Sequence, residues 1–189
     1  AVEEMKDVEF IIASGSLPSG VPLDIYAQLA KVAKRINAKF VVDTSGEALK
    51  QAADEGVYLL KPNLGELSSL AGKKELQPGE VNNIATEIIK KGKCEVMVVS
   101  MGAAGAMLVT NNLTEMIVPP PAMKKSTVGA GDSMVAGIIF YLSRGKSLPE
   151  AVRYGVACGT AATMNPGTEL CRKEDADWLY SVINEAARK

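Results

Sequence analysis

Three small residues stand directly before a carboxylate in the segment STVGAGD, where Gly129, Ala130 and Gly131 precede Asp132. The apolar stretch that follows, SMVAGIIFYL, predicts a helix. Backbone N–H groups at a glycine-rich helix start can converge on an anion, and the positive end of the helix dipole adds to the attraction. A carboxylate there could accept a proton from a substrate hydroxyl, as phosphoryl transfer requires. The alternative is a plain glycine-rich turn, with Asp132 favouring the dipole.

A second loop, KPNLGE, follows an apolar run and places Lys61 before Asn63 and Glu66. The last two are three residues apart, so they lie on one side of the following turn. An amide and a carboxylate in this arrangement could hold magnesium through water molecules. The same spacing is that of a capping box, so a purely structural role remains open.

The loop SMGAAG contains Ser100, Gly102 and Gly105 after another apolar run. Glycines there can let the phosphate or ribose of a nucleotide approach the backbone closely, or can simply form the entry to a hairpin. Asp43 ends a further apolar run, and we expect it either to support a site as a second acid or to cap the next helix.

The segment ATMNPGT ends a predicted helix with Asn165, Pro166 and Gly167. The last carbonyl groups of a helix lack partners within it, so they are expected to be free here. Together with Ser126 and Val128 they could bind a monovalent cation. An ordinary helix stop is the alternative.

The composition excludes several classes of chemistry. The 189 residues include no histidine, which removes Ser-His-Asp catalysis and most zinc chemistry. With 21 basic and 22 acidic residues the net charge is −1, so we expect neither nucleic acid nor a membrane surface as a partner. No apolar run reaches the roughly 18 residues of a membrane span, and we expect a cytoplasmic protein. The three cysteines lack metal-ligand spacing and are expected to be plain thiols.

The elements that must position these loops alternate between strand and helix. Strands are predicted at 9–13, 39–46, 57–63 and 95–102, and a hairpin is predicted around Asn111 and Asn112. Helices are predicted at 22–36, 47–56, 64–72, 80–92, 131–144, 148–164 and 173–188. This order predicts an α/β fold with an open, mostly parallel sheet, in a single domain over residues 1–189. Ligands of such sheets bind beyond the carboxyl ends of the strands, where these loops lie.

Six segments resemble, in this order, the PfkB branch of the ribokinase-like sugar kinases: DTSGEAL, KPNLGEL, VVSMGAAGAM, VPPP, STVGAGDSMVAG and GTAATMNPGTELC. The resemblance covers essentially the whole chain and is most specific from Thr127 to Gly137. It implies a ribokinase-like three-layer α/β fold. The chain resembles the C-terminal part of a longer kinase, without the family's N-terminal part and its β-sheet lid, through which relatives often form homodimers.

The resemblance implies transfer of the ATP γ-phosphate to a sugar phosphate, most simply fructose 6-phosphate to fructose 1,6-bisphosphate in glycolysis. Fructose 1-phosphate and tagatose 6-phosphate are alternative substrates, because the family's sugar-reading residues lie mostly in the part without a counterpart here. A nucleotide-binding fragment without turnover is the alternative of another class.

The resemblance also assigns roles to single residues. Asp132 would be the catalytic base, contacting the substrate, and Gly129, Ala130 and Gly131 would form the anion hole. Ser16 would touch the sugar. The nucleotide would be bound by Lys61, Asn63, Ser100, Gly102, Gly105, Val156 and Thr160. Magnesium would be held by Asn63 and Glu66, and potassium by Ser126, Val128, Ala162, Asn165 and Gly167.

Overall fold

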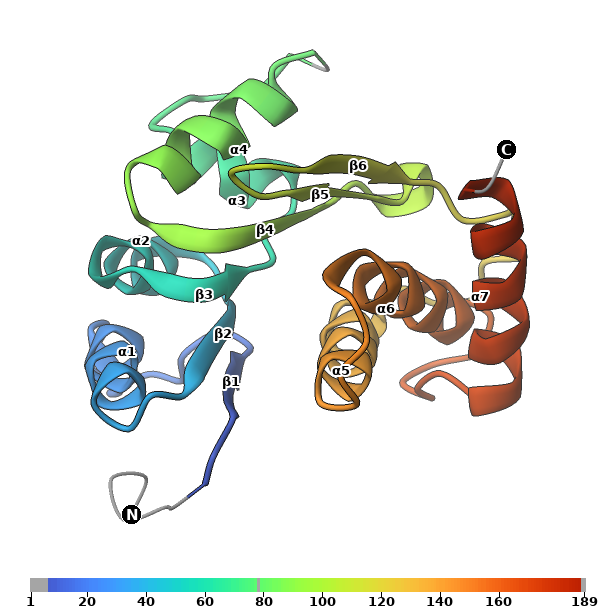
Figure 1. The fold of residues 1–189 in the computed structure, drawn as a ribbon, viewed down its shortest axis with the longest axis horizontal. Helices are drawn as coiled ribbons and strands as arrows, with labels where there is room; N and C mark the ends of the chain where they lie inside the picture. Colours follow the sequence, from blue (N-terminus) through green and yellow to red (C-terminus); the bar gives the residue numbers. More distant parts are fainter. Residues whose placement is uncertain (1–6, 78, 188–189) are drawn as a thin grey trace. The chain divides into compact units, whose positions relative to one another are not determined.

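The computed structural model describes residues 7–77 and 79–187 (Figure 1). Every strand and helix expected from the sequence is present in it, with ends shifted by a few residues. In chain order the elements are β1 (Phe10–Ser14), α1 (Ile25–Arg35), β2 (Lys39–Asp43), α2 (Gly46–Glu55), β3 (Val57–Leu60), α3 (Leu64–Leu70), α4 (Val81–Lys90), β4 (Cys94–Ser100), a 3₁₀ turn (Gly102–Ala104), β5 (Ala106–Val109), β6 (Thr114–Ile117), α5 (Ala130–Leu142), α6 (Leu148–Thr163) and α7 (Lys173–Ala187).

The strands form a sheet in which they follow one another in chain order, from β1 to β6, within the described residues. The pairs β1–β2, β2–β3 and β3–β4 are parallel, which confirms the expected α/β class with a mostly parallel sheet. The hairpin expected around Asn111 and Asn112 is also present, and the Thr110 N–H donates a hydrogen bond to the Leu113 carbonyl at 2.8 Å across its turn.

The chain divides into two compact units, and the first holds the described residues up to Ser100 together with Met107–Thr114. The inner strands β2 to β4 are buried almost throughout, as expected for near-continuous apolar runs in a parallel sheet. Helices α1 to α4 contact one another in chain order and lie against β2, β3 and β4.

The second unit holds Met101–Ala106 and the described residues from Glu115 onward, and its core is formed by α5, α6 and α7. Helices α5 and α6 approach closely because glycines face the neighbouring helix: a Cβ atom built on Gly155 would lie 2.8 Å from the Met134 carbonyl oxygen. Leu179 and Ile183 of α7 are also buried. The expectation of one domain over 1–189 stays a prediction.

Within the described part of the chain, no helix is both long enough and apolar enough to cross a lipid bilayer.

Candidate functional site

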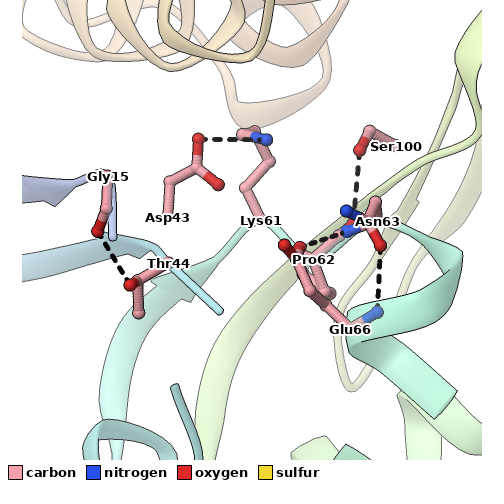
Figure 2. Close-up of polar contacts among 8 residues, drawn as sticks. All are labelled: Gly15, Asp43, Thr44, Lys61, Pro62, Asn63, Glu66 and Ser100. Atoms are coloured by element: carbon pink, nitrogen blue, oxygen red, sulfur yellow. Dashed lines mark hydrogen bonds and ion pairs between the residues drawn. The ribbon is translucent and has the colours of Figure 1, made fainter. Parts of the chain in front are cut away.

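The carboxyl ends of β1 to β4 lie at one edge of the sheet and are tied together by hydrogen bonds (Figure 2). After β1 and β2, the Thr44 hydroxyl donates to the Gly15 carbonyl at 2.8 Å. After β3 and β4, an isolated bridge pairs Asn63 with Ser100, and the Ser100 N–H donates to the Pro62 carbonyl at 2.9 Å. The loops predicted to carry chemistry in this unit are therefore held at one edge. Ser16, the residue expected to touch the sugar, follows β1 and is exposed.

Lys61 and Asp43 form an ion pair at this edge, with 3.1 Å between the Lys61 Nζ and an Asp43 carboxylate oxygen (Figure 2). Lys61 is only 5% exposed. A buried ammonium group needs a compensating charge, because removal from water is costly. The N-cap of α2 is Ser45 and not Asp43, and the role of Asp43 as a second acid that supports a site stays a prediction. Thr44, whose hydroxyl links the ends of β1 and β2, was not identified from the sequence. Its position next to an aspartate at a strand end could have indicated this role.

Asn63 and Glu66 form the capping box that their spacing allows. The Asn63 side chain accepts a hydrogen bond from the Glu66 N–H at 2.9 Å, and a Glu66 carboxylate oxygen accepts one from the Asn63 N–H at 2.8 Å. The structural alternative is thus confirmed for this pair. Among the residues that the structure describes, no group of three or more His, Cys, Asp or Glu side chains could hold a metal ion. The magnesium role of Asn63 and Glu66 stays a prediction.

The loop after β4 requires glycine for structural reasons. Gly105 has a positive φ of 95°, and a Cβ atom there would lie 2.0 Å from the Ile117 carbonyl oxygen. The Met101 N–H donates to the Gly105 carbonyl at 2.8 Å, which closes the turn around Gly102. The glycines are thus needed for the entry to the β5–β6 hairpin, and the nucleotide-binding role of Ser100, Gly102 and Gly105 stays a prediction.

Helix α5 begins at Ala130, and its N-cap is Gly129 in the left-handed conformation, with φ 73°. The N-cap residue is a glycine, so it has no side chain with which to cap the first N–H groups of the helix. Asp132 lies in the first turn and is exposed. Backbone donors, the positive end of the dipole and an accessible carboxylate are thus present together. This is the arrangement expected for an anion hole formed by Gly129, Ala130 and Gly131 beside a base.

The two segments predicted to surround potassium lie side by side. The Ser126 hydroxyl donates to the Gly167 carbonyl at 2.6 Å, and the Ser126 N–H donates to the Thr163 carbonyl at 3.3 Å. The expectation that the helix-end carbonyls are free needs correction, because Gly167 and Ala162 each already accept a hydrogen bond. A carbonyl oxygen has two lone pairs, so each keeps acceptor capacity for a cation.

Asn165, also predicted at the potassium site, is 4% exposed and donates from its side chain to the Leu170 carbonyl at 2.8 Å. Val128 donates its N–H to the Ser126 hydroxyl at 3.2 Å. On α6, Val156 is 1% exposed, and the Thr160 hydroxyl donates to the Val156 carbonyl. The proximity of Val156 and Thr160 to an adenine ring stays a prediction. The candidate residues thus form two sets, one on each compact unit.

The alternating strands and helices, and the helix α5 that begins directly after a glycine, agree with the similarity of this chain to known proteins. Residues 1–175 match the pfkB family of carbohydrate kinases, and the chain belongs to this family. It is 43% identical over 184 residues to the ATP-dependent 6-phosphofructokinase isozyme 2 of Escherichia coli strain K12, covering 97% of this chain and 60% of that protein. It is 35% identical over 169 residues to the 1-phosphofructokinase of Bacillus subtilis strain 168, covering 88% of this chain and 55% of that protein.

The crystal structure of phosphofructokinase-2 from Escherichia coli in complex with potassium matches this fold with a TM-score of 0.92 at 43% identity. The match covers 97% of this chain and 60% of that one. The expected family and ribokinase-like fold are therefore confirmed. The chain spans between about half and three-fifths of the length of these relatives.

Proposed function

We propose that this chain carries residues of an ATP-dependent sugar-phosphate kinase that phosphorylates fructose 6-phosphate at its 1-hydroxyl. The observation that carries the proposal is the start of α5, where a glycine N-cap precedes the exposed residue Asp132 in the first turn. Membership of the pfkB family supports the reaction class. The 6-phosphofructokinase isozyme 2 of Escherichia coli is more similar in sequence than the Bacillus subtilis 1-phosphofructokinase, which supports the choice of sugar.

In this proposal Asp132 accepts the proton of the sugar hydroxyl as the phosphoryl group moves to its oxygen. The N–H groups of Gly129, Ala130 and Gly131 donate hydrogen bonds to the phosphoryl oxygens, on which negative charge spreads in the transition state. The helix start holds these donors in place. The Ala130 N–H donates to the Thr127 carbonyl at 3.4 Å in the structure, and it would give up this long bond to reach a phosphoryl oxygen.

The first unit supplies the groups suited to the nucleotide phosphates. Lys61 offers a positive charge at a strand end, and its ion pair with Asp43 holds the ammonium group in place. Asn63 and Glu66 would hold magnesium, which neutralises phosphate charge when bound. Their oxygens fit this ion, because each reaches solvent and is oriented by the capping box.

Ser126, Val128, Ala162, Asn165 and Gly167 would bind potassium through carbonyl and hydroxyl oxygens. The support is that two chain segments rich in such oxygens lie against each other, and that the related Escherichia coli enzyme was crystallised with potassium. The same unit contains the start of α5, and a Cβ atom on Gly129 would lie 2.8 Å from the Leu170 side chain. A cation in this unit would therefore stabilise the segment that packs behind the proposed anion hole.

The test is ADP release from magnesium-ATP with fructose 6-phosphate, fructose 1-phosphate or tagatose 6-phosphate as the acceptor. We expect turnover with fructose 6-phosphate and a loss of about 100-fold to 10,000-fold in Asp132→Asn, while ATP binding is kept. Asp175→Asn is the matched control, since Asp175 also lies in the first turn of a helix, α7, and should leave turnover unchanged. Equal turnover in Asp132→Asn and the wild type would reject Asp132 as the base.

The second candidate function is nucleotide binding without turnover. Its signature is a folded chain that binds ATP but releases no ADP with any of the three sugars. Turnover by this chain with any one of them would exclude it.

A further inference from the structure

The second unit contains a surface hollow of about 490 Å³ that the proposed reaction does not use. It lies at the end of α5, and residues of α6 and α7 complete its lining. Four aromatic side chains line it, which are Phe140, Tyr141, Tyr154 and Tyr180. A space of this size falls within the range of sites that bind small organic molecules.

The aromatic rings of the hollow pack against one another and form a wall. The rings of Tyr141 and Tyr154 are stacked with 3.9 Å between their centroids, and Tyr180 meets both edge to face at 5.1 and 5.4 Å. Phe140 stacks on Tyr154 at 5.9 Å and is 40% exposed. Tyr154 is buried, so it supports the wall from behind, while Phe140 and Tyr141 reach solvent. A planar ring of a ligand can stack on such a surface.

The hollow contains one carboxylate, Asp177, which already has partners. One of its oxygens accepts a hydrogen bond from the Tyr154 hydroxyl at 3.0 Å, and the other is paired with the Lys173 ammonium group. The hydrogen bond from Lys173 lowers the pKa of Asp177, which agrees with this pairing. The charges of Asp177 and Lys173 therefore compensate each other.

Two further cations, Arg144 and Lys146, also line the hollow. The Arg144 guanidinium lies over the Phe140 ring, with 3.5 Å between its central carbon and the ring centroid, and this contact holds it beside the aromatic wall. Glu150, whose charge acts on Lys146, accepts hydrogen bonds from Ser147. Among the residues that the structure describes, neither Arg144 nor Lys146 forms an ion pair, so both charges are available to a ligand.

We propose that this hollow binds a small molecule in which a planar ring carries a phosphate monoester. The ring would stack on Phe140 and Tyr141, and the phosphate oxygens would accept hydrogen bonds from Arg144 and Lys146. The arginine fork can donate two parallel hydrogen bonds to such a group, and the lysine adds a second charge. A phosphate dianion balances both cations, whereas a carboxylate balances one.

A tyrosine hydroxyl adds a further donor. Burial raises the pKa of Tyr141 to about 12, so its hydroxyl keeps the proton at neutral pH and can donate a hydrogen bond. All the groups that this inference uses lie in the second unit, and it does not depend on the proposed kinase activity.

The experiment is titration of the purified, isotope-labelled 189-residue chain with phenyl phosphate, followed by the amide chemical shifts in NMR spectra. Phenol, inorganic phosphate and benzoate are the matched probes, which carry the ring alone, the anion alone, and the ring with a single charge. We expect phenyl phosphate to bind at least about tenfold more tightly than each of them, because only it engages both the wall and the two cations. The shifts should be largest across residues 140–146 and 173–180.

Four results would overturn the proposal. Inorganic phosphate that binds as tightly as phenyl phosphate would mean that the ring has no part, and the same result for phenol would mean that the anion has none. Benzoate of equal affinity would contradict the choice of a phosphate. No binding of phenyl phosphate, or shifts confined to residues 129–132 at the start of α5, would show that the hollow is not the site.

Variants test the two parts of the site separately. The double variant Arg144→Gln with Lys146→Gln should weaken phenyl phosphate binding by about tenfold or more and leave phenol binding unchanged. Phe140→Leu keeps an apolar side chain and should reduce the preference for phenyl phosphate over inorganic phosphate. Lys50→Gln, at an exposed lysine of α2, is the matched control and should bind all four probes as the wild type does. Wild-type affinity in the double variant, with circular dichroism showing that it is folded, would reject the site.

Discussion

Replacing Gly155 with alanine tests how closely α5 and α6 must pack. A Cβ atom at this position would lie 2.4 Å from Ile138 Cγ1 and 2.8 Å from the carbonyl oxygen of Met134. The isoleucine could turn away in part. The carbonyl belongs to the backbone of α5, so relief of that contact requires the two helices to separate.

Two opposing effects set the size of the change in stability. Alanine is favoured over glycine within a helix by about 1 kcal/mol. Overpacking of a core costs about 1–3 kcal/mol, and a contact with backbone places this case near the upper end. The expected net loss is therefore about 2 kcal/mol of unfolding free energy. With a urea dependence of about 2 kcal/mol per molar, the unfolding midpoint should fall by about 1 M.

The assay is urea unfolding followed by the fluorescence of Trp178, the single tryptophan of the chain, which lies in α7 of the same unit. Gly79→Ala is the matched control, because a Cβ atom there meets nothing within 4 Å. Its unfolding free energy should change by about 0.5 kcal/mol or less. A midpoint for Gly155→Ala equal to or above that of the wild type would refute the reasoning, since it would mean that helix propensity outweighs the clash.

Two further predictions concern charged groups. Lys61→Met should lower the unfolding free energy by about 3 kcal/mol, because it removes the buried ammonium group that pairs with the Asp43 carboxylate. Lys31→Met, at a more exposed ion pair, should cost about 1 kcal/mol or less. Equal losses in thermal unfolding would argue against a structural role for the buried pair. The hydrogen bond from Lys173 lowers the pKa of Asp177 below its ordinary value of 3.8, so this contribution to stability is present above that value and is lost as the pH falls through the lowered pKa. The melting temperature should therefore fall more steeply below about pH 4 in the wild type than in Asp177→Asn, and parallel curves would contradict the assignment.

The local features of the fold were predictable from the sequence, because they depend on neighbours in the chain. The apolar run of β2 and the helical spacing in α1 each reflect which faces are buried, and both elements occur where expected. The spacing of Asn63 and Glu66 left a capping box and a metal site open, and the capping box is present. An amide and a carboxylate at this spacing suit both roles, so sequence alone could not choose.

The contacts between distant segments could not be predicted in the same way. The pairing of Lys61 with Asp43 depends on the register between β2 and β3, and the hydrogen bond from Ser126 to Gly167 depends on how α5 and α6 pack. These contacts depend on how the elements pack in three dimensions, which the sequence pattern does not specify directly.

The order of the strands has a consequence for how the chain is made. Because each strand lies beside the one that precedes it in the sequence, from β1 to β6, every newly synthesised strand finds its partner already in place. Each pairing joins strands that are neighbours in the chain, so the entropy lost in closing the connection is smaller than for strands far apart in the sequence. The sheet can therefore grow during translation in the direction of synthesis. The start of α5 therefore emerges after the strand ends that carry Lys61 and Asn63 have been made.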